Sequence, residues 1–313
     1  MKILSDKNDK LKLKNTCVTI GTFDGLHVGH QNILSVLSNI AKQKNLQSTV
    51  VSFDPHPRKV IAKNYDIKIL TTLDEKKEIL EQLGIDNFYL INFTEKFSEQ
   101  TSEEFVKNFI VDRFDAKNVV VGHDHKFGKD RVGDADALRN LGEKFGFDVT
   151  SVDAVKLNNE IVSSTIIRQA LIDGDIDRAN TFLGRSYTMQ GEVVTGAKRG
   201  RILGFPTANL GMRNSDKLIP QTGVYAVGCD LNGEDLHGVM NIGYRPTFAD
   251  TTELVPEVHL FNFNRIIYGE ILKINFIKKI RHEKKFASKD ELISQIELDK
   301  KTAAKILAVE ITN

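Results

Sequence analysis

Apolar positions in the first half of the chain follow two different periods. Short runs rich in β-branched residues predict strands, and between them apolar residues recur at the three- and four-residue spacing of helices. The strands are expected at residues 16–21, 48–53, 87–92, 118–122 and 147–153. The helices are expected after residue 30, at 73–83, from 102, at 134–145, at 164–173 and at 176–183. Strands that alternate with helices predict an open α/β sheet whose strands run parallel.

The pattern changes after Gly184, where the apolar runs become short, aromatic or β-branched and are separated by glycine. Strands are expected at residues 187–194, 223–231, 237–243, 257–263 and 270–277. The pair Asn232–Gly233 between two of these runs is a strong hairpin signal. This half is therefore expected to form a small antiparallel barrel or sandwich, followed by a helix that Ser288 and Glu291 cap and that ends near residue 307. We predict two domains, residues 1–183 and 184–313.

Composition and charge narrow the functional classes. The chain has 313 residues, 41% hydrophobic and 27% charged, which is typical of a globular protein. A formal net charge of +1 gives no basic field for nucleic acid. No signal segment and no apolar run of about 18 residues is present, so a membrane protein is not expected. Cys17 and Cys229 are expected to be buried thiols in a cytoplasmic protein. The charge runs 74–78 and 281–285 are expected to be solvated.

The first candidate site is the stretch GTFDGLHVGH at residues 21–30. Its glycines allow close approach of the backbone, and its two histidines, His27 and His30, arrive where a helix follows a strand. A helix N-terminus attracts phosphate, and imidazoles can donate hydrogen bonds to phosphoryl oxygens. A solvated histidine pair and a metal site remain alternatives, although the other candidate ligands have no defining spacing: His56, His123 and His125.

The same stretch resembles the HxGH signature of the nucleotidylyltransferases, and SSTIIR at 163–168 resembles their second phosphate-binding signature. FDPHPR, GHDHKFGKDR and LGRSYTMQG, at 53–58, 122–131 and 183–191, resemble the bacterial FAD synthetases within that superfamily. The resemblance implies a Rossmann-like sheet and catalytic roles for His27, His30 and Arg168. It implies nucleotide contacts from Gly21, Phe23, Asp24, Gly29, Asp124, Ser164 and Thr165, and flavin contacts from Phe53 and Phe127. His125 departs from the aromatic residue usual in the family, which is expected to alter flavin stacking without abolishing binding.

The second candidate site is GRILGFPTANL at residues 200–210, which by itself is as compatible with an ordinary loop as with a binding site. The string resembles the riboflavin kinase signature, and further matches follow at 223–227, 241–248, 257–263, 267–270 and 280–286. The resemblance implies that Glu257 is the catalytic base. It implies that ATP phosphate contacts Gly204, Pro206, Thr207 and Asn209, that Thr207 and Asn209 also bind Mg²⁺, and that flavin contacts Arg281 and Phe286. Asn262 stands where the family usually has aspartate. The basic run at 196–201 is expected to face phosphate and not nucleic acid.

The chemistry expected of the two sites differs in one respect. A riboflavin hydroxyl is a poor nucleophile and benefits from a positioned carboxylate, and Glu257 shares a strand face with residues 259 and 261. The phosphate of FMN is already ionised and needs no general base. The resemblance therefore implies a bifunctional enzyme that makes FMN from riboflavin and ATP, and then FAD and pyrophosphate from FMN and ATP. The alternatives are a kinase with a degenerate N-terminal domain, an adenylyltransferase for another phosphate substrate, and a non-catalytic flavin-binding protein. The sequence leaves the oligomeric state open.

Overall fold

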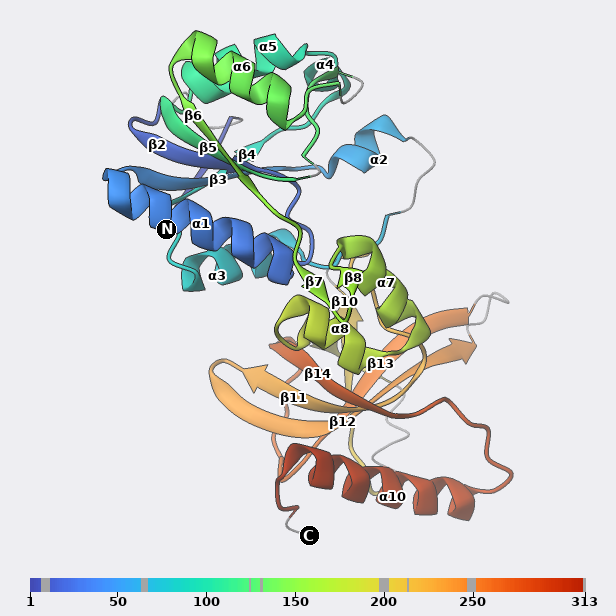
Figure 1. Ribbon diagram of the computed structural model, residues 1–313. Coiled ribbons are helices and arrows are strands. Elements are labelled where there is room, and N and C mark those ends of the chain that lie inside the picture. The colour runs from blue at the N-terminus through green and yellow to red at the C-terminus, as the bar shows by residue number, and fades with distance from the viewer. Residues whose placement is uncertain are drawn as a thin grey trace. The chain divides into compact units, whose positions relative to one another are not determined.

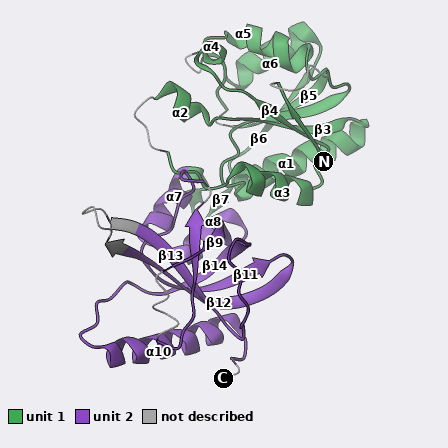
Figure 2. Cartoon of the chain, turned by 180° about the vertical axis from the view of Figure 1, so that it is seen from behind, with its two compact units in different colours: residues 1–164 green, residues 165–313 purple. Residues whose placement is uncertain are grey.

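The computed structural model describes residues 1–6, 12–62, 67–123, 125–129, 132–196, 203–212, 214–246 and 252–311. The chain forms two compact units, Met1–Ser164 and Thr165–Asn313 (Figure 2). Each unit has its own sheet, and each is described below by itself.

Unit 1 contains a six-stranded sheet in the order β1-β4-β3-β2-β5-β6, in which every neighbouring pair runs parallel. The strands are β1 Lys2–Ser5, β2 Thr16–Ile20, β3 Gln47–Phe53, β4 Asn87–Ile91, β5 Ala116–Gly122 and β6 Asp148–Val152. The open parallel sheet expected from the sequence is thus confirmed, and β1 adds an edge strand that was not predicted. A parallel sheet places the carboxyl ends of its strands along one edge, which is where ligands bind in such folds.

Helices cover both faces of this sheet (Figure 1). Adjacent residues of one strand face opposite cores, so Cys17 packs with Leu34 and Leu37 of one helix layer, whereas Val18 packs with Phe105 and Leu138 of the other. The elements that connect the strands are α1 Val28–Lys44, α2 Pro57–Ile61, α3 Leu73–Gln82, α4 Glu95–Ser98, α5 Ser102–Phe105, the π-helix η1 Val106–Val111, α6 Ala135–Phe145 and the short pair β7 Lys156–Leu157 and β8 Glu160–Ile161. Thr101 and Glu104 form a capping box at the start of α5.

Unit 2 begins within α7 Ser164–Asp173 and continues through α8 Ile176–Leu183 into a closed antiparallel barrel. The barrel order is β10-β13-β12-β11-β14-β9, and β9 pairs with β10 to close it. Its strands are β9 Tyr187–Val194, β10 Ala208–Met212, β11 Gly223–Leu231, β12 Glu234–Pro246, β13 Thr252–Leu260 and β14 Ile271–Arg281. The predicted hairpin is confirmed, because Asn232 and Gly233 have φ values of 55° and 87°, as a two-residue type I′ turn requires.

The C-terminal helix α10, Lys289–Leu307, packs on the barrel with Ala303 buried against Ala226 and Phe261. The N-terminal cap of α10 differs in one hydrogen bond from the predicted capping box. Ser288 accepts a hydrogen bond from the Glu291 N–H, but the Glu291 carboxylate accepts from the Ala287 N–H and not from that of Ser288. The helix is therefore fixed to the chain one residue further upstream than in a capping box.

The charge run at 74–78 is not the solvated cluster expected from the sequence. Glu75 and Lys76 are 3% and 8% exposed. The Glu75 carboxylate completes a capping box with Thr72, and Lys76 lies on the same face of α3 as Leu80. The prediction was wrong because a run of charges carries no information about which of its members has a buried partner. Cys17 and Cys229, in contrast, are buried free thiols as expected.

Candidate active sites

The turn between β2 and α1 has an unusual backbone. Phe23, Gly25 and Leu26 have φ values of 46°, 88° and 40°. Two residues other than glycine therefore have a left-handed backbone conformation. Both of these side chains are buried, which holds the turn in that conformation. His27 is the N-cap of α1, and its Nδ1 accepts a hydrogen bond of 3.3 Å from the His30 N–H. The turn and the helix N-terminus are thereby fixed to each other.

The two predicted phosphate-binding histidines lie together. Their rings stack with centroids 3.7 Å apart and planes 17° apart, and the Phe23 ring packs edge-on against His30 at 5.2 Å. A Cβ at Gly29 would lie 3.2 Å from the His27 ring, so glycine leaves room for this stack. Gly21 does the same for Phe23, whose ring would lie 3.2 Å from an added Cβ. The result is a pair of imidazoles held at a helix N-terminus, where anions are favoured.

Asp24 joins this turn to two distant segments. Its carboxylate accepts hydrogen bonds from the Leu70 N–H at 2.9 Å and the Thr71 N–H at 3.0 Å, and it is only 3% exposed. Its carbonyl accepts a 2.8 Å hydrogen bond from the Ser164 hydroxyl. Asp24, predicted to contact nucleotide, therefore also ties the start of α7 and the segment before α3 to the histidine turn.

Lys76 is a buried cation beside the same turn that the sequence reading missed. Its Nζ donates to the Thr22 carbonyl at 2.6 Å and to the Ser52 hydroxyl at 3.2 Å. Burial lowers its pKa from 10.5 to about 8, against the opposing effect of Asp24 and Asp54. The one signal in the sequence is its position three residues after Leu73 and four before Leu80, on the apolar face of α3.

The predicted flavin contacts of the first site lie in aromatic groups. Phe53, at the end of β3, packs against Phe93 and Phe97 with centroids 5.5 and 6.0 Å away. Phe127 is nearly parallel to His125, with centroids 5.8 Å apart, so this ring still carries an aromatic stack at the position that departs from the family. Asp124 lies outside the described residues.

The remaining predicted phosphate contacts lie at the start of α7. Thr165 is exposed, and Arg168 is half-buried. Arg168 follows Ser164 by four residues and so shares its face of the helix. Ser164 is the last residue of unit 1, and Thr165 and Arg168 belong to unit 2.

In unit 2 the structure brings Thr207, Asn209 and Glu257 together. Asn209 on β10 is the register partner of Glu257 on β13, and the Thr207 hydroxyl donates to the Glu257 carboxylate at 3.4 Å. Asn209 is buried and Glu257 is half-buried. A Cβ at Gly196 would lie 2.2 Å from the Asn209 amide nitrogen, so the chain after β9 passes directly over that side chain. A hydroxyl, an amide and a carboxylate thus converge where neighbouring strands meet.

His259 supports the loop that precedes Thr207. Its Nδ1–H donates to the Pro206 carbonyl at 2.8 Å, and its ring meets Phe205 edge-on at 6.0 Å. Burial lowers the pKa of His259, while the hydrogen bond to Pro206 opposes this shift. Gly204, with φ of 89°, makes the turn that brings Pro206 to this position. The sequence shows that His259 lies on the same strand face as Glu257. It does not show that His259 bonds to Pro206.

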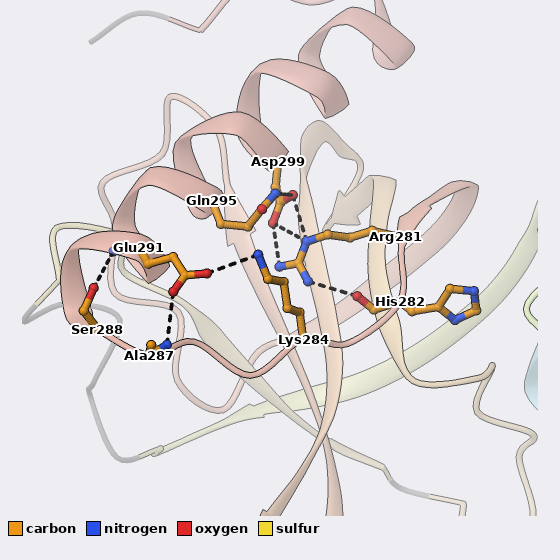
Figure 3. Close-up of polar contacts among 8 residues, drawn as sticks. All are labelled: Arg281, His282, Lys284, Ala287, Ser288, Glu291, Gln295 and Asp299. Carbon is orange, nitrogen blue, oxygen red and sulfur yellow. Dashed lines mark hydrogen bonds and ion pairs between the residues drawn. The ribbon is translucent and has the colours of Figure 1, made fainter.

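Arg281 and Phe286 lie together as well. Figure 3 shows Arg281 beside Asp299. The Arg281 Nε donates to both oxygens of Asp299 at 3.0 Å, and the guanidinium carbon lies 5.7 Å from the centre of the Phe286 ring. The sequence reading did not include Asp299. Asn262 has a φ of 52°, and its amide donates to the Glu310 carbonyl at 2.9 Å. Asparagine tolerates such a backbone well, which gives a structural reason for this residue.

Comparisons with known proteins agree in both halves of the chain. A family model for FAD synthetase matches residues 9–166, and one for riboflavin kinase matches residues 183–307. A bifunctional riboflavin kinase/FMN adenylyltransferase of Listeria monocytogenes is 42% identical over 286 residues, which cover 91% of this chain and 90% of that one. The protein of the same description in Bacillus subtilis is 40% identical over 290 residues, with coverage of 91% and 90%.

A solved structure has nearly the same fold throughout. The crystal structure of a Streptococcus pneumoniae protein described as a macrolide-efflux protein superposes with a TM-score of 0.89 at 31% identity, covering 97% of this chain and 99% of that one. Among the described residues, no helix has the length and apolar character needed to cross a membrane. With both family models matched in order and relatives about 40% identical along nine-tenths of their length, the chain belongs to the bifunctional riboflavin kinase/FMN adenylyltransferase family.

Proposed function

We propose that the chain phosphorylates riboflavin to FMN in its C-terminal half and adenylylates FMN to FAD in its N-terminal half, with ATP as the co-substrate of both steps. The observation that carries this proposal is the convergence of Thr207, Asn209 and Glu257 in one unit, while His27, stacked on His30, caps a helix in the other. The proposed catalytic modules are residues 1–183 and 184–313, so that α7 and α8 serve the first module although they cluster with unit 2.

In the kinase reaction, Glu257 accepts the proton of a riboflavin hydroxyl as that oxygen attacks the γ-phosphorus of ATP. The bond from that phosphorus to the ADP oxygen breaks, and ADP leaves. Thr207 and Asn209 are placed to hold the phosphates, together with the loop of Gly204 and Pro206. The contact between Thr207 and Glu257 supports this assignment, because base and phosphate must lie side by side during transfer.

Magnesium belongs to this proposal. Thr207, Asn209 and Glu257 offer a hydroxyl, an amide and a carboxylate oxygen, which are the ligand types that Mg²⁺ accepts while it keeps part of its water shell. The donor set therefore fits the ion, and Thr207 and Asn209 are its proposed protein ligands. When bound, Mg²⁺ would neutralise charge on the transferring phosphoryl group.

In the adenylyl transfer, the ionised phosphate of FMN attacks the α-phosphorus of ATP, and pyrophosphate leaves. The proposed role of His27, His30 and Arg168 is to donate hydrogen bonds and positive charge to the phosphates. The other proposed nucleotide contacts are Gly21, Phe23, Asp24, Gly29, Asp124, Ser164 and Thr165. Phe53 and Phe127 are the proposed flavin contacts in this module, and Arg281 and Phe286 those in the kinase module.

We also propose that the protein is located in the cytoplasm. The two cysteines are buried free thiols, which suits a reducing compartment.

A product time course tests the function. Purified protein is incubated with riboflavin, ATP and Mg²⁺, and riboflavin, FMN and FAD are separated by chromatography, with His27→Ala and Glu257→Gln in parallel. We expect wild type to form FMN and then FAD, His27→Ala to stop at FMN, and Glu257→Gln to make neither product from riboflavin but still to convert supplied FMN to FAD. A wild type that stops at FMN would leave a kinase with a degenerate N-terminal site. Absence of any phosphorylation would favour a flavin-binding protein.

A further inference from the structure

Residues 282–288, which we call the β14–α10 connection, are attached to the rest of unit 2 at both ends. At its start, all three guanidinium nitrogens of Arg281 donate to protein acceptors: Nε and Nη2 to Asp299, with Nη2 at 2.8 Å, and Nη1 to the His282 carbonyl at 3.0 Å. The Asp299 side chain on α10 is 4% exposed and that of Arg281 is 22% exposed. A charge pair with this burial and geometry is far more restrictive than a surface salt bridge.

The other end of the connection is held by Glu291 (Figure 3). Its carboxylate accepts from the Ala287 N–H at 3.1 Å and pairs with Lys284 at 3.2 Å. Between the two ends, the connection passes over strand β12. A Cβ at Gly243 would lie 2.6 Å from the Glu283 carboxylate, so that side chain occupies the space that glycine leaves. The connection is therefore fixed to both α10 and the barrel wall.

The strand register relates this connection to the proposed kinase site. One residue from each of five neighbouring strands lies in a single row: Arg281, Val224, Asn241, Glu257 and Asn209. Arg281 and Glu257 are three strands apart, or about 14 Å along the wall. Asn209 flanks Glu257 on one side, and Asn241 flanks it on the other, two residues from Gly243. Thr207 and Asn209 thus lie on the β10 side of Glu257, and the connection lies on the β12 side.

This arrangement assigns the two substrates to opposite sides of Glu257. Phosphoryl transfer needs the attacking and leaving oxygens roughly in line on opposite sides of the phosphorus. If ATP phosphate is held on the side of Thr207 and Asn209, the attacking hydroxyl must come from the side of β12. The β14–α10 connection covers that side, and Glu283 lies over Gly243 there.

We propose that Asp299 is a positioning residue for riboflavin in the kinase reaction; this rests on the proposed function. Asp299 holds Arg281, and Arg281 in turn fixes the start of the connection and places its guanidinium carbon over the Phe286 ring. Gln295 donates to Asp299 at 3.0 Å and restrains the carboxylate from the same helix. Arg281, a proposed flavin contact, thereby also holds the wall of the riboflavin site, because each of its nitrogens has a protein acceptor.

The test compares Asp299→Asn with a matched control in the full-length protein. Glu234→Gln removes another carboxylate paired with an arginine, Arg265, at the hairpin end of β12, away from Asn241. For Asp299→Asn we expect the KM for riboflavin to rise about tenfold, because displacement of a positioning group by about 1 Å costs up to a hundredfold. The KM for ATP and the conversion of supplied FMN to FAD should stay at wild-type values, and Glu234→Gln should match wild type throughout.

Two further variants keep the proposal falsifiable if Asp299→Asn folds poorly. Glu291→Gln loosens the exposed attachment without touching the buried pair and should raise the same KM to a smaller extent. Arg281→Gln combined with Asp299→Asn should cost no more than either single change, because both remove one interaction. An unchanged riboflavin KM, or equal changes in the KM for riboflavin and for ATP, would overturn the proposal. Failure of wild type itself to make FMN would instead reject the proposed kinase function.

Discussion

The buried Lys76 predicts a specific dependence of stability on pH. Its pKa is 10.5 when exposed to solvent and about 8 in the folded protein. Between these two values the unfolded chain binds more protons than the folded one, so the free energy of unfolding rises with pH. Below the folded value both states are protonated, and above the unfolded value both are neutral. A pKa difference of one unit is equivalent to roughly 1.4 kcal/mol, so the free energy of unfolding rises by about 3 kcal/mol across this pH range.

Replacement of Lys76 by methionine removes this titration and keeps a chain of similar length on the apolar face of α3. Urea unfolding of wild type and Lys76→Met is followed by circular dichroism between about pH 7 and pH 10.5. Lys117→Met is the control, since that side chain is 46% exposed on β5 of the same sheet. We expect the stability of wild type relative to Lys76→Met to increase by about 3 kcal/mol from the low to the high end, and Lys117→Met to follow wild type. Parallel curves for wild type and Lys76→Met would refute the reasoning.

Two further substitutions test local geometry. Gly196→Ala places a Cβ 2.2 Å from the Asn209 amide nitrogen. We expect this variant to form FMN about a hundredfold more slowly, while its conversion of supplied FMN to FAD is unchanged. Equal loss of both activities would point to general misfolding. Asn232→Ala forces alanine into a left-handed φ of 55°, so we expect it to destabilise the barrel by about 1 kcal/mol. The KM values for riboflavin and ATP should not change. An unaltered melting temperature would contradict the turn assignment.

The main strands were predictable from the sequence because each has a local signature. Buried parallel strands such as 118–122 are continuous apolar runs, and the hairpin at Asn232–Gly233 needs only its own two residues. Two strands of the parallel sheet and the barrel lacked such a signature. β1, Lys2–Ser5, is a four-residue edge strand in a charged segment. β10, Ala208–Met212, follows a Gly-Phe-Pro turn and contains a glycine of its own, and its pairing with β9 and β13 comes from distant parts of the chain.

The site residues show the same division. Thr207, Asn209 and Glu257 were predicted from the resemblance, and their proximity depends on a register between strands that are far apart in the sequence. Lys76 and Asp299 were not predicted, because each acquires its role from partners that sequence spacing does not reveal. The run 281–285 illustrates the point, since residues 282–285 are exposed as expected, whereas the first of them, Arg281, is held by Asp299.

Asp24 and Glu257, one in each proposed site, are carboxylates in different surroundings. Asp24, beside the stacked histidines, accepts hydrogen bonds from the Leu70 and Thr71 N–H groups and is 3% exposed, so its carboxylate holds the turn together. The Glu257 carboxylate accepts a hydrogen bond of 3.4 Å from the Thr207 hydroxyl and is half-buried between Asn209 and Asn241. Ionised FMN needs no base and riboflavin does. The more accessible of the two carboxylates, the proposed base, therefore lies in the unit whose substrate still has a proton to lose.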